Sequence, residues 1–328
     1  MDYVRLGRSG LRVSQLCLGT MSYGNRDWYP WLLDERQARP FFEKALDAGI
    51  NFFDTADMYS RGLSEEILGR AIADLVADRE DVVVATKCFG GTQADPGPNR
   101  RGLSRKHIVD ACDRSLKRLG LDYIDLYQIH RFDPEVPMEE TLGALNHLVE
   151  AGKVRYIGAS SMYAWQFARY LHLAETRGWA RFSSMQNFYN LLYREEEREM
   201  LPLCREEGIG VIPWSPLARG YLARDRFDSK DSLRARNDHF ADNLFSEARD
   251  GAVIRRNAEV AREMGVKPAQ TALAWLLTQS PVAAPIIGAT RIEHLEDALA
   301  ALDLVLDDDT RAQLEAPYQP HPVLGNLS

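Results

Sequence analysis

Short apolar runs alternate with helix-length amphipathic segments along most of the 328 residues of this chain. Regular alternation of strand and helix predicts parallel strands joined by right-handed crossovers. Eight such strands close into an α/β fold, the (β/α)8 TIM barrel. The predicted strands are Leu16–Leu18, Asn51–Phe53, Val82–Ala85, Tyr123–Gln128, Val154–Gly158, Phe182–Met185, Gly210–Pro213 and Pro285–Ile287.

Glycines mark the ends of the predicted helices. Gly49, Gly120, Gly152, Gly178 and Gly208 each follow the last residue of a periodic segment. Glycine is favoured there because it enters the left-handed region without steric cost. The predicted helices are Glu35–Ala48, Glu65–Ala77, Ser104–Leu119, Met138–Ala151, Ala164–Arg177, Glu195–Glu207, Ala252–Met264, Pro268–Thr278, Ile292–Leu302 and Asp308–Glu315.

Three segments lie outside this alternation. Two short apolar stretches flank Arg8–Gly10 and predict an N-terminal β-hairpin. The polar stretch Ala218–Arg249 is long enough to suggest a lid or binding loop. The proline-containing tail Ala316–Ser328 is expected to fold back over the barrel.

No boundary divides residues 1–328, so we expect a single barrel domain. The alternative, an open doubly wound sheet, usually carries G-x-G-x-x-G after its first strand, and that motif is absent.

Charge and cysteine content limit the partners. Forty Lys and Arg against 48 Asp and Glu give a net charge of −8, which argues against nucleic acid or an anionic membrane as a partner. No apolar run reaches the roughly 18 residues that span a bilayer, and the first residues lack a signal-peptide core. Four widely spaced cysteines form no C-x-x-C motif. We therefore expect a cytoplasmic protein of enzyme size. A monomer and a modest homo-oligomer both fit the sequence.

Polar residues follow the strands at the end where barrel enzymes carry their active sites. Asp54 follows the second strand with Tyr59 five residues later, Lys87 follows the third, and His130 follows the fourth. Each residue alone has a structural explanation, such as a turn cap, a packed ring or a surface charge. Their convergence at one rim favours a proton-transfer set.

The residue types suit reduction of a carbonyl group. A phenol has a pKa of about 10, and a neighbouring ammonium lowers it. Asp54 would keep Lys87 charged beside Tyr59, and His130 would donate to the carbonyl oxygen as charge develops there. The hydride would then come from a nicotinamide cofactor.

The last strand suggests which cofactor binds. Thr290-Arg291-Ile292-Glu293 opens a helix with the pattern of a capping box, and a helix amino end is a phosphate site. His294 and Asp297 fall on nearly the same helical face as Arg291. A basic pair there suits a 2′-phosphate and favours NADPH over NADH. Trp214 at the rim either stacks on the nicotinamide or packs in the core.

Several motifs carry a resemblance to a known family. GINFFDTADMYSRGLSEEILGRAI (residues 49–72), VVVATK (82–87) and LYQIHRFD (126–133) resemble the catalytic motifs of the aldo-keto reductases. KVRYIGASS, MQNFYNLL, IPWSPLARG and PIIGATR resemble the cofactor segments in their usual order. The likeness extends along nearly the whole chain and is nearest to the bacterial branch with aryl-alcohol dehydrogenase-like members.

The resemblance implies an NADP(H)-dependent oxidoreductase, with weaker use of NADH possible. Tyr59 would be the general acid, tuned by Lys87 and Asp54, and His130 would orient the carbonyl. The implied cofactor-binding residues are Thr20, Met21, Asp54, Ser160, Ser161, Gln186, Trp214, Ser215, Leu217, Arg219, Gly288, Thr290, Arg291, His294 and Asp297.

Two positions depart from the family pattern, because many members have Asn where this chain has Ser161 and Ala298. The first is expected to affect contact with the nicotinamide carboxamide, and the second affects contact with the adenine.

Aromatic residues surround the predicted mouth of the site. Trp28, Tyr29, Phe89 and Phe132 suggest a bulky or aromatic carbonyl substrate, and the alternative is that these rings only pack the loops down.

Two other function classes are alternatives to a reductase. A nucleotide-binding regulatory subunit, resembling the β subunits of potassium channels, would not need the complete tetrad. A metal-dependent barrel hydrolase would need H-E-x-x-H, H-x-H or a carboxylate cluster, and the sequence has none of these, so no metal site is expected.

Overall fold

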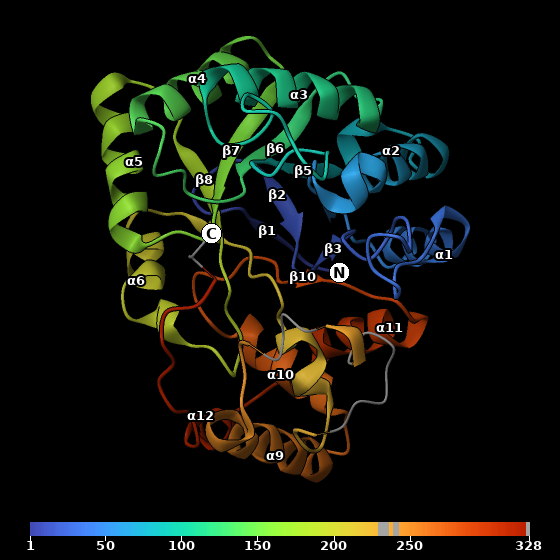
Figure 1. Ribbon diagram of the computed structural model, residues 1–328. Helices are drawn as coiled ribbons and strands as arrows, with labels where there is room; N and C mark the ends of the chain where they lie inside the picture. The colour runs from blue at the N-terminus through green and yellow to red at the C-terminus, as the bar shows by residue number, and fades with distance from the viewer. Residues whose placement is uncertain (229–235, 239–242, 326–328) are drawn as a thin grey trace.

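A computed structural model describes residues 1–228, 236–238 and 243–325. Within them, eight strands form one parallel sheet in the order β10-β3-β4-β5-β6-β7-β8-β9 (Figure 1), which confirms the predicted (β/α)8 barrel. The strands are β3 (Cys17–Gly19), β4 (Phe52–Asp54), β5 (Val83–Cys88), β6 (Ile124–Ile129), β7 (Val154–Ser160), β8 (Phe182–Gln186), β9 (Gly210–Val211) and β10 (Ile286–Ile287).

Backbone hydrogen bonds join the two outer strands of this sheet. Val211 N donates to Pro281 O at 3.1 Å, Ala283 N donates to Val211 O at 2.8 Å, and Ile286 N donates to Pro213 O at 2.9 Å. The segment leading into β10 is thereby attached to β9, so the sheet closes on itself and leaves no free edge at this seam.

Helices cover the outside of the strands (Figure 1), and α9, α10 and α12 lie together on the side opposite α3 and α4. All five glycines predicted to end helices have positive φ, from 64° at Gly208 to 83° at Gly49. The helices are α1 (Glu35–Asp47), α2 (Leu63–Leu75), α3 (Arg105–Leu119), α4 (Met138–Glu150), α5 (Ala164–Arg177), α6 (Met200–Glu206), α9 (Glu247–Glu263), α10 (Pro268–Leu277), α11 (Ile292–Ala300) and α12 (Asp308–Glu315).

Two helices differ from the prediction by more than two residues at a boundary. The expected helix Glu195–Glu207 is divided into a 3₁₀ turn, η3 (Glu195–Glu197), and α6. Side chains of the turn bind elsewhere: Asn187 donates to Glu196, and Tyr318 donates to Glu195. These tertiary contacts compete with a continuous helix. In the other case, α9 begins at Glu247 rather than at Ala252.

The strand pleat decides which residues face the barrel interior. The hairpin β1 (Tyr3–Arg5) and β2 (Arg12–Ser14) confirms the predicted N-terminal hairpin. Leu6 and Val13, beside and within the hairpin, pack with inward-facing Phe52, Val83 and Leu126 in one core cluster. Alternate residues Phe53, Val84 and Tyr127 join the second cluster, between strands and helices. Since side chains alternate across a strand, the residues two positions after Phe52 and Leu126 also face the interior, closer to the carboxyl ends of the strands.

The segment Ala218–Arg249 is described only in part. It begins with a 3₁₀ helix, η4 (Ala218–Ala223), and Arg219 makes two hydrogen bonds to Asp238, at 2.7 and 2.9 Å. Residues 229–235 and 239–242 lie outside the described residues, so the lid hypothesis falls partly on them.

The C-terminal tail folds back onto the loops at the carboxyl end of the barrel, as expected. Leu324 N donates to Tyr193 Oη at 2.9 Å, and His321 Nε2 lies 2.7 Å from Asp250 Oδ1. A Cβ on Gly325 would lie 3.2 Å from Trp214 Cζ2, so the tail lies directly against that ring.

Candidate active site

A buried ion pair occupies the centre of the barrel at the carboxyl ends of β4 and β5. Lys87 Nζ donates to Asp54 Oδ2 at 2.5 Å and to Thr55 O at 2.7 Å, and it lies 3.4 Å from Tyr59 Oη. Lys87 is 0% exposed and Asp54 is 2% exposed. Burial lowers the pKa of Lys87, but Asp54 and Tyr59 outweigh it and hold that pKa above its ordinary value. The amine therefore stays an ammonium ion.

Two glutamines hold the other oxygen of Asp54. Gln128 Nε2 and Gln186 Nε2 each donate to Asp54 Oδ1 at 3.0 Å, and Gln186 Nε2 also lies 3.2 Å from Gln128 Oε1. Gly158 gives them room, because a Cβ there would lie 2.5 Å from Ser184 Oγ and 2.9 Å from Gln128 Cγ. Gln128 was not predicted as a site residue, although its position two before His130 indicates the same face of the strand.

Tyr59 lies in a sharply turned loop just after β4. Ser60 and Arg61 have φ of 48° and 58°, in the left-handed region that non-glycine residues seldom enter. Ser60 Oγ accepts from Asn25 N at 2.7 Å, which ties this turn to the aromatic first loop. The Tyr59 ring is half-buried, and Lys87 Nζ lies 5.0 Å from its centroid.

The pKa of Tyr59 differs from the expectation. Burial raises it, and Lys87 lowers it by less, so the net pKa lies above the ordinary value of a tyrosine. The ammonium acts in the predicted direction, but loss of solvent outweighs it because the charged phenolate is the form that burial disfavours. The phenol is therefore protonated at neutral pH.

His130 completes the predicted tetrad. Its half-buried ring meets the Tyr59 ring edge-on, with centroids 5.8 Å apart and an interplanar angle of 81°. Burial, followed by the charges of Lys87 and Arg131, lowers the pKa of His130 well below its ordinary value. The imidazole is therefore neutral, and a neutral imidazole carries one N–H that can donate to a substrate oxygen. The structure brings Asp54, Tyr59, Lys87 and His130 together as expected.

Two further buried carboxylates, Glu65 and Asp57, lie close to the Tyr59 loop in the sequence. Glu65 accepts from Thr86 Oγ1 at 2.6 Å and from Arg118 Nε at 2.6 Å. Asp57 is 2% exposed, and within the described residues its Oδ1 has no hydrogen-bond partner. Burial and then Glu65 raise the pKa of Asp57 to about 7. Sequence analysis missed this group because its packing is tertiary.

Trp214 is fixed on one face and at its ring nitrogen. Its ring stacks on Phe188 with centroids 4.4 Å apart and planes 20° apart, and its Nε1 donates to Ser161 Oγ at 3.1 Å. Ser160 Oγ donates to Gln186 O at 2.8 Å. Ser161 therefore contacts the tryptophan, and Ser160 contacts the strand that carries Gln186.

An acceptor and an aromatic ring at this rim fit a nicotinamide carboxamide. Gln186 Nε2 is used within the barrel, whereas its Oε1 accepts from no other described residue. A carbonyl oxygen held in this way can accept from an amide N–H of a ligand. The half-buried ring of Trp214 beside it offers a flat apolar surface.

Other expected cofactor residues have protein partners. The Thr20 hydroxyl lies 2.8 Å from Ser64 Oγ and donates to Asp54 O at 3.2 Å, which is a structural role. Ser215 has a φ of 52°, and its carbonyl accepts from Asn190 Nδ2 at 3.1 Å. Arg219 binds Asp238 within its own loop. The remaining expected rim residues are half-buried Met21 and Leu217 and exposed Gly288.

The amino end of α11 differs from the predicted capping box. Arg291, not Thr290, is the N-cap residue, and its side chain makes no capping hydrogen bond. The T-x-x-E box is therefore wrong. The helix begins one residue later than that pattern requires. The N-cap side chain therefore does not cap the backbone N–H groups of the first turn, and a helix amino end of this kind suits an anion.

Charged side chains surround this helix end. Arg291 Nε lies 3.4 Å from Glu293, and the Arg291 side chain is 69% exposed. His294 is exposed, and Asp297 pairs with Lys267 at 2.8 Å. Lys267 is an additional cation that sequence analysis did not identify. Its place beside α11 depends on how α10 packs.

The aromatic residues divide into two groups. Trp28 lies 6.0 Å from Tyr59 and 4.7 Å from Tyr29, measured between ring centroids, and so forms a wall beside the phenol. Phe132 makes its ring contacts with Trp165 and Tyr170 of α5, at 6.4 and 6.3 Å. Phe132 thus packs against the helical layer, and Phe89 is half-buried after β5.

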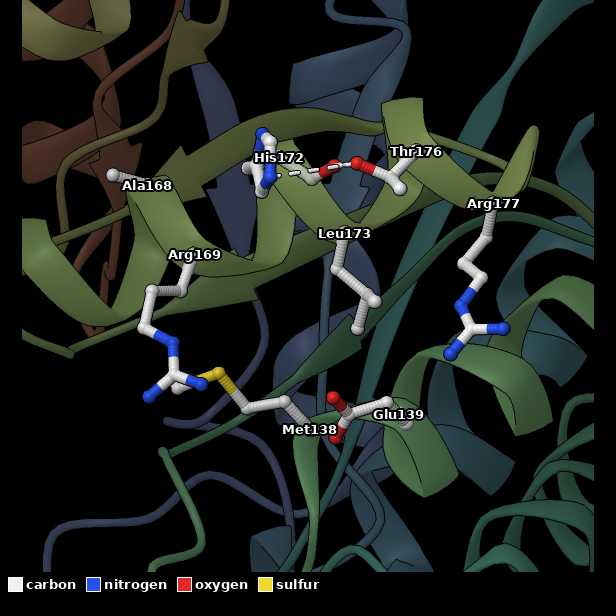
Figure 2. Close-up of a pocket in the computed structure, with 8 residues that line it drawn as sticks. All are labelled: Met138, Glu139, Ala168, Arg169, His172, Leu173, Thr176 and Arg177. Carbon is white, nitrogen blue, oxygen red and sulfur yellow. Dashed lines mark hydrogen bonds between the residues drawn. The ribbon is translucent and has the colours of Figure 1, made fainter.

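A separate groove of about 530 Å³ lies between α4 and α5 on the outside of the barrel (Figure 2). Leu173 and Met138 form its apolar part, and Arg169, Arg177 and Glu139 point along it. None of its lining residues belongs to the tetrad.

Among the described residues, no three His, Cys, Asp or Glu side chains gather as a metal-binding set. Within the same residues, no helix has the length and apolar character of a membrane span.

Comparison with known proteins gives a consistent match. The model of the aldo/keto reductase family matches residues 15–319. A Schizosaccharomyces pombe protein, provisionally named an aryl-alcohol dehydrogenase, is 45% identical over 346 residues, covering 99% of this chain and 98% of the relative. The versiconal hemiacetal acetate reductase of Aspergillus parasiticus is 45% identical over 342 residues, covering 98% of each chain. An aldo-keto reductase of Fusarium vanettenii is 44% identical over 349 residues, covering 99% and 93%.

Proposed function

The chain belongs to the aldo/keto reductase family, and on that premise we propose that it is an NADPH-dependent oxidoreductase that reduces aldehydes or ketones reversibly to alcohols. The contact of Lys87 Nζ with both Asp54 and Tyr59 Oη carries the proposal. This contact puts a charged amine beside a protonated phenol, at the end of the barrel where the polar residues gather.

The proton is the part of the reaction that these side chains handle. When bound, the nicotinamide supplies a hydride to the carbonyl carbon. Tyr59 Oη donates its proton to the carbonyl oxygen, and Lys87 stabilises the tyrosinate that remains. Asp54 keeps Lys87 protonated and in place. Neutral His130 donates a hydrogen bond to the same oxygen, so charge developing there is met from two sides.

The cofactor assignment rests on two groups of residues. Gln186 Oε1 and the ring of Trp214 would hold the nicotinamide end. Arg291 and His294, at the uncapped amino end of α11, would bind the 2′-phosphate through charge-assisted hydrogen bonds. The exposure of Arg291 supports its availability for a phosphate.

The substrate class follows from the wall beside Tyr59. Trp28 and Tyr29 offer aromatic surface next to the phenol, which favours a bulky or aromatic carbonyl compound. The names of two relatives, which refer to aryl alcohols and to versiconal hemiacetal acetate, support this choice.

Purified protein with NADPH and a panel of aromatic aldehydes and ketones tests the proposal. We expect loss of NADPH absorbance together with formation of the matching alcohol. Tight NADPH binding without reduction of any carbonyl would contradict the enzymatic proposal and favour the regulatory alternative.

A further inference from the structure

Arg131 lies at the mouth of the candidate site with no carboxylate to neutralise it. It directly follows His130 and is half-buried. Its Cζ lies 6.0 Å from the centroid of the Trp214 ring, and its Nη1 donates to His130 O at 3.1 Å. Over the residues that the structure describes, no Asp or Glu lies in ion-pair contact with it.

The other guanidinium groups with limited exposure differ from Arg131. Arg118 pairs with Glu65 at 2.6 Å, Arg194 pairs with Glu197 at 2.7 Å, and Arg219 pairs with Asp238 at 2.7 Å. A cation withdrawn from water loses hydration, and an anion held at hydrogen-bond distance compensates for that loss. Arg131 lacks this compensation from the described residues.

The position of Arg131 relative to the reacting groups is the second observation. Its charge acts on both Tyr59 and His130, so the guanidinium shares their electrostatic environment. The proton transfer proposed above does not use it, since Lys87 and Asp54 already support Tyr59. Arg131 is therefore available to the part of the substrate that does not react.

We propose that Arg131 is a specificity-determining residue that binds a carboxylate on the carbonyl substrate, an inference that rests on the proposed reductase function. A guanidinium presents its donors as a planar fork, which matches a carboxylate with two parallel hydrogen bonds. With Trp28 on the Tyr59 side and Arg131 on the Trp214 side, the substrate class is an aromatic aldehyde or ketone that carries a carboxylate group.

The test compares the ortho, meta and para carboxybenzaldehydes with their methyl esters, which keep the shape and lose the charge. Wild type is expected to prefer the best acid over its ester by about tenfold or more in kcat/KM, mainly through KM. Arg131→Gln should lose this preference and keep its activity on the esters and its affinity for NADPH. Arg131→Lys should keep part of the preference. Arg169→Gln, in the outer groove of Figure 2, is the matched control and should behave as wild type.

A readout without turnover separates this inference from the reductase proposal. Quenching of tryptophan fluorescence by benzoate, compared with benzamide, reports anion binding to the NADP⁺-loaded protein. Tighter benzoate binding that Arg131→Gln abolishes supports the inference even if no aldehyde is reduced. Equal use of acids and esters by wild type would overturn it and leave the reductase function standing. Equal slowing of every substrate together with weaker NADPH binding in Arg131→Gln would assign the guanidinium to the cofactor and also overturn it.

Discussion

Lys87 Nζ lies 2.5 Å from Asp54 Oδ2, and the two side chains are almost fully withdrawn from solvent. Gln128 and Gln186 hold the other oxygen of Asp54, so the ion pair belongs to a polar layer that crosses the barrel. The ion pair therefore contributes to the stability of the fold as well as to the proposed chemistry.

Replacing Lys87 with Met should reveal how much the ion pair contributes to stability. The substitution leaves a buried carboxylate without its counter-ion, which costs about 3–5 kcal/mol of the free energy of unfolding. Adding Asp54→Asn to Lys87→Met removes the unpaired charge and should recover a large part of this loss in urea denaturation. A double variant as unstable as the sum of the two single variants would show that the charges are not coupled.

Asp57 should make wild-type stability depend on pH. Burial and Glu65 raise its pKa from 3.8 to about 7, so between these values the folded protein holds a proton that the unfolded chain has released. Stability from this group is therefore lost as pH rises through that window, by about 4 kcal/mol in full, at about 1.4 kcal/mol per pKa unit.

Asp57→Asn removes the free-energy cost of ionising this buried carboxylate. The variant should be more stable than wild type at about pH 8 and should lose that advantage near pH 4, as measured by denaturation across the pH range. The matched control is Asp122→Asn, at an exposed position. An advantage that is the same at both pH values would mean that Asp57 does not hold a proton in the folded state.

Ser161 should act on the cofactor through Trp214. Ser161→Ala removes the hydroxyl that accepts from the indole N–H. Loss of this hydrogen bond costs about 1 kcal/mol, which corresponds to about fivefold weaker NADPH binding. The kcat should change little, because Ser161 is not in the tetrad. Fluorescence titration measures the binding, with half-buried Ser183→Ala, near the amino end of β8 and away from the rim, as the control. Equal NADPH affinity in Ser161→Ala and wild type would contradict the positioning role.

Arg291 should set the preference between the two nicotinamide cofactors. Arg291→Ala is expected to raise the KM for NADPH about tenfold and to leave the KM for NADH unchanged, because only NADPH carries the phosphate. The control is Lys44→Ala. Lys44 makes a surface ion pair with Glu296 of α11, the helix that follows Arg291. A parallel rise for both cofactors would place Arg291 elsewhere on the nucleotide.

The fold was predictable because its signals are local. Strand runs, amphipathic segments and the glycines from Gly49 to Gly208 each depend on neighbours in the chain. The pleat also makes Asp54, Lys87 and His130 converge, since parallel strands present the same end to one rim. The same alternation points to Gln128, two residues before His130, although the polar layer it forms was not anticipated.

The rest depends on contacts between distant segments. The net pKa of Tyr59 follows from how deeply the folded chain buries the ring, which no spacing reveals. The lone charge of Arg131 is visible only once the partners of the other arginines are known. The start of α11 at Ile292, with Arg291 as the N-cap, is set by the backbone path out of β10 and not by the T-x-x-E pattern.

The most direct measurement of the central claim is the reduction of an aromatic aldehyde by wild type and Tyr59→Phe under identical NADPH saturation. Loss of the phenolic proton should lower kcat by about 10² or more and leave NADPH binding intact, because general acid catalysis contributes at least that factor. Fluorescence titration on the same samples establishes that the variant binds NADPH. Turnover by Tyr59→Phe at a rate close to that of wild type would contradict the role of Tyr59 and the mechanism built on its contact with Lys87.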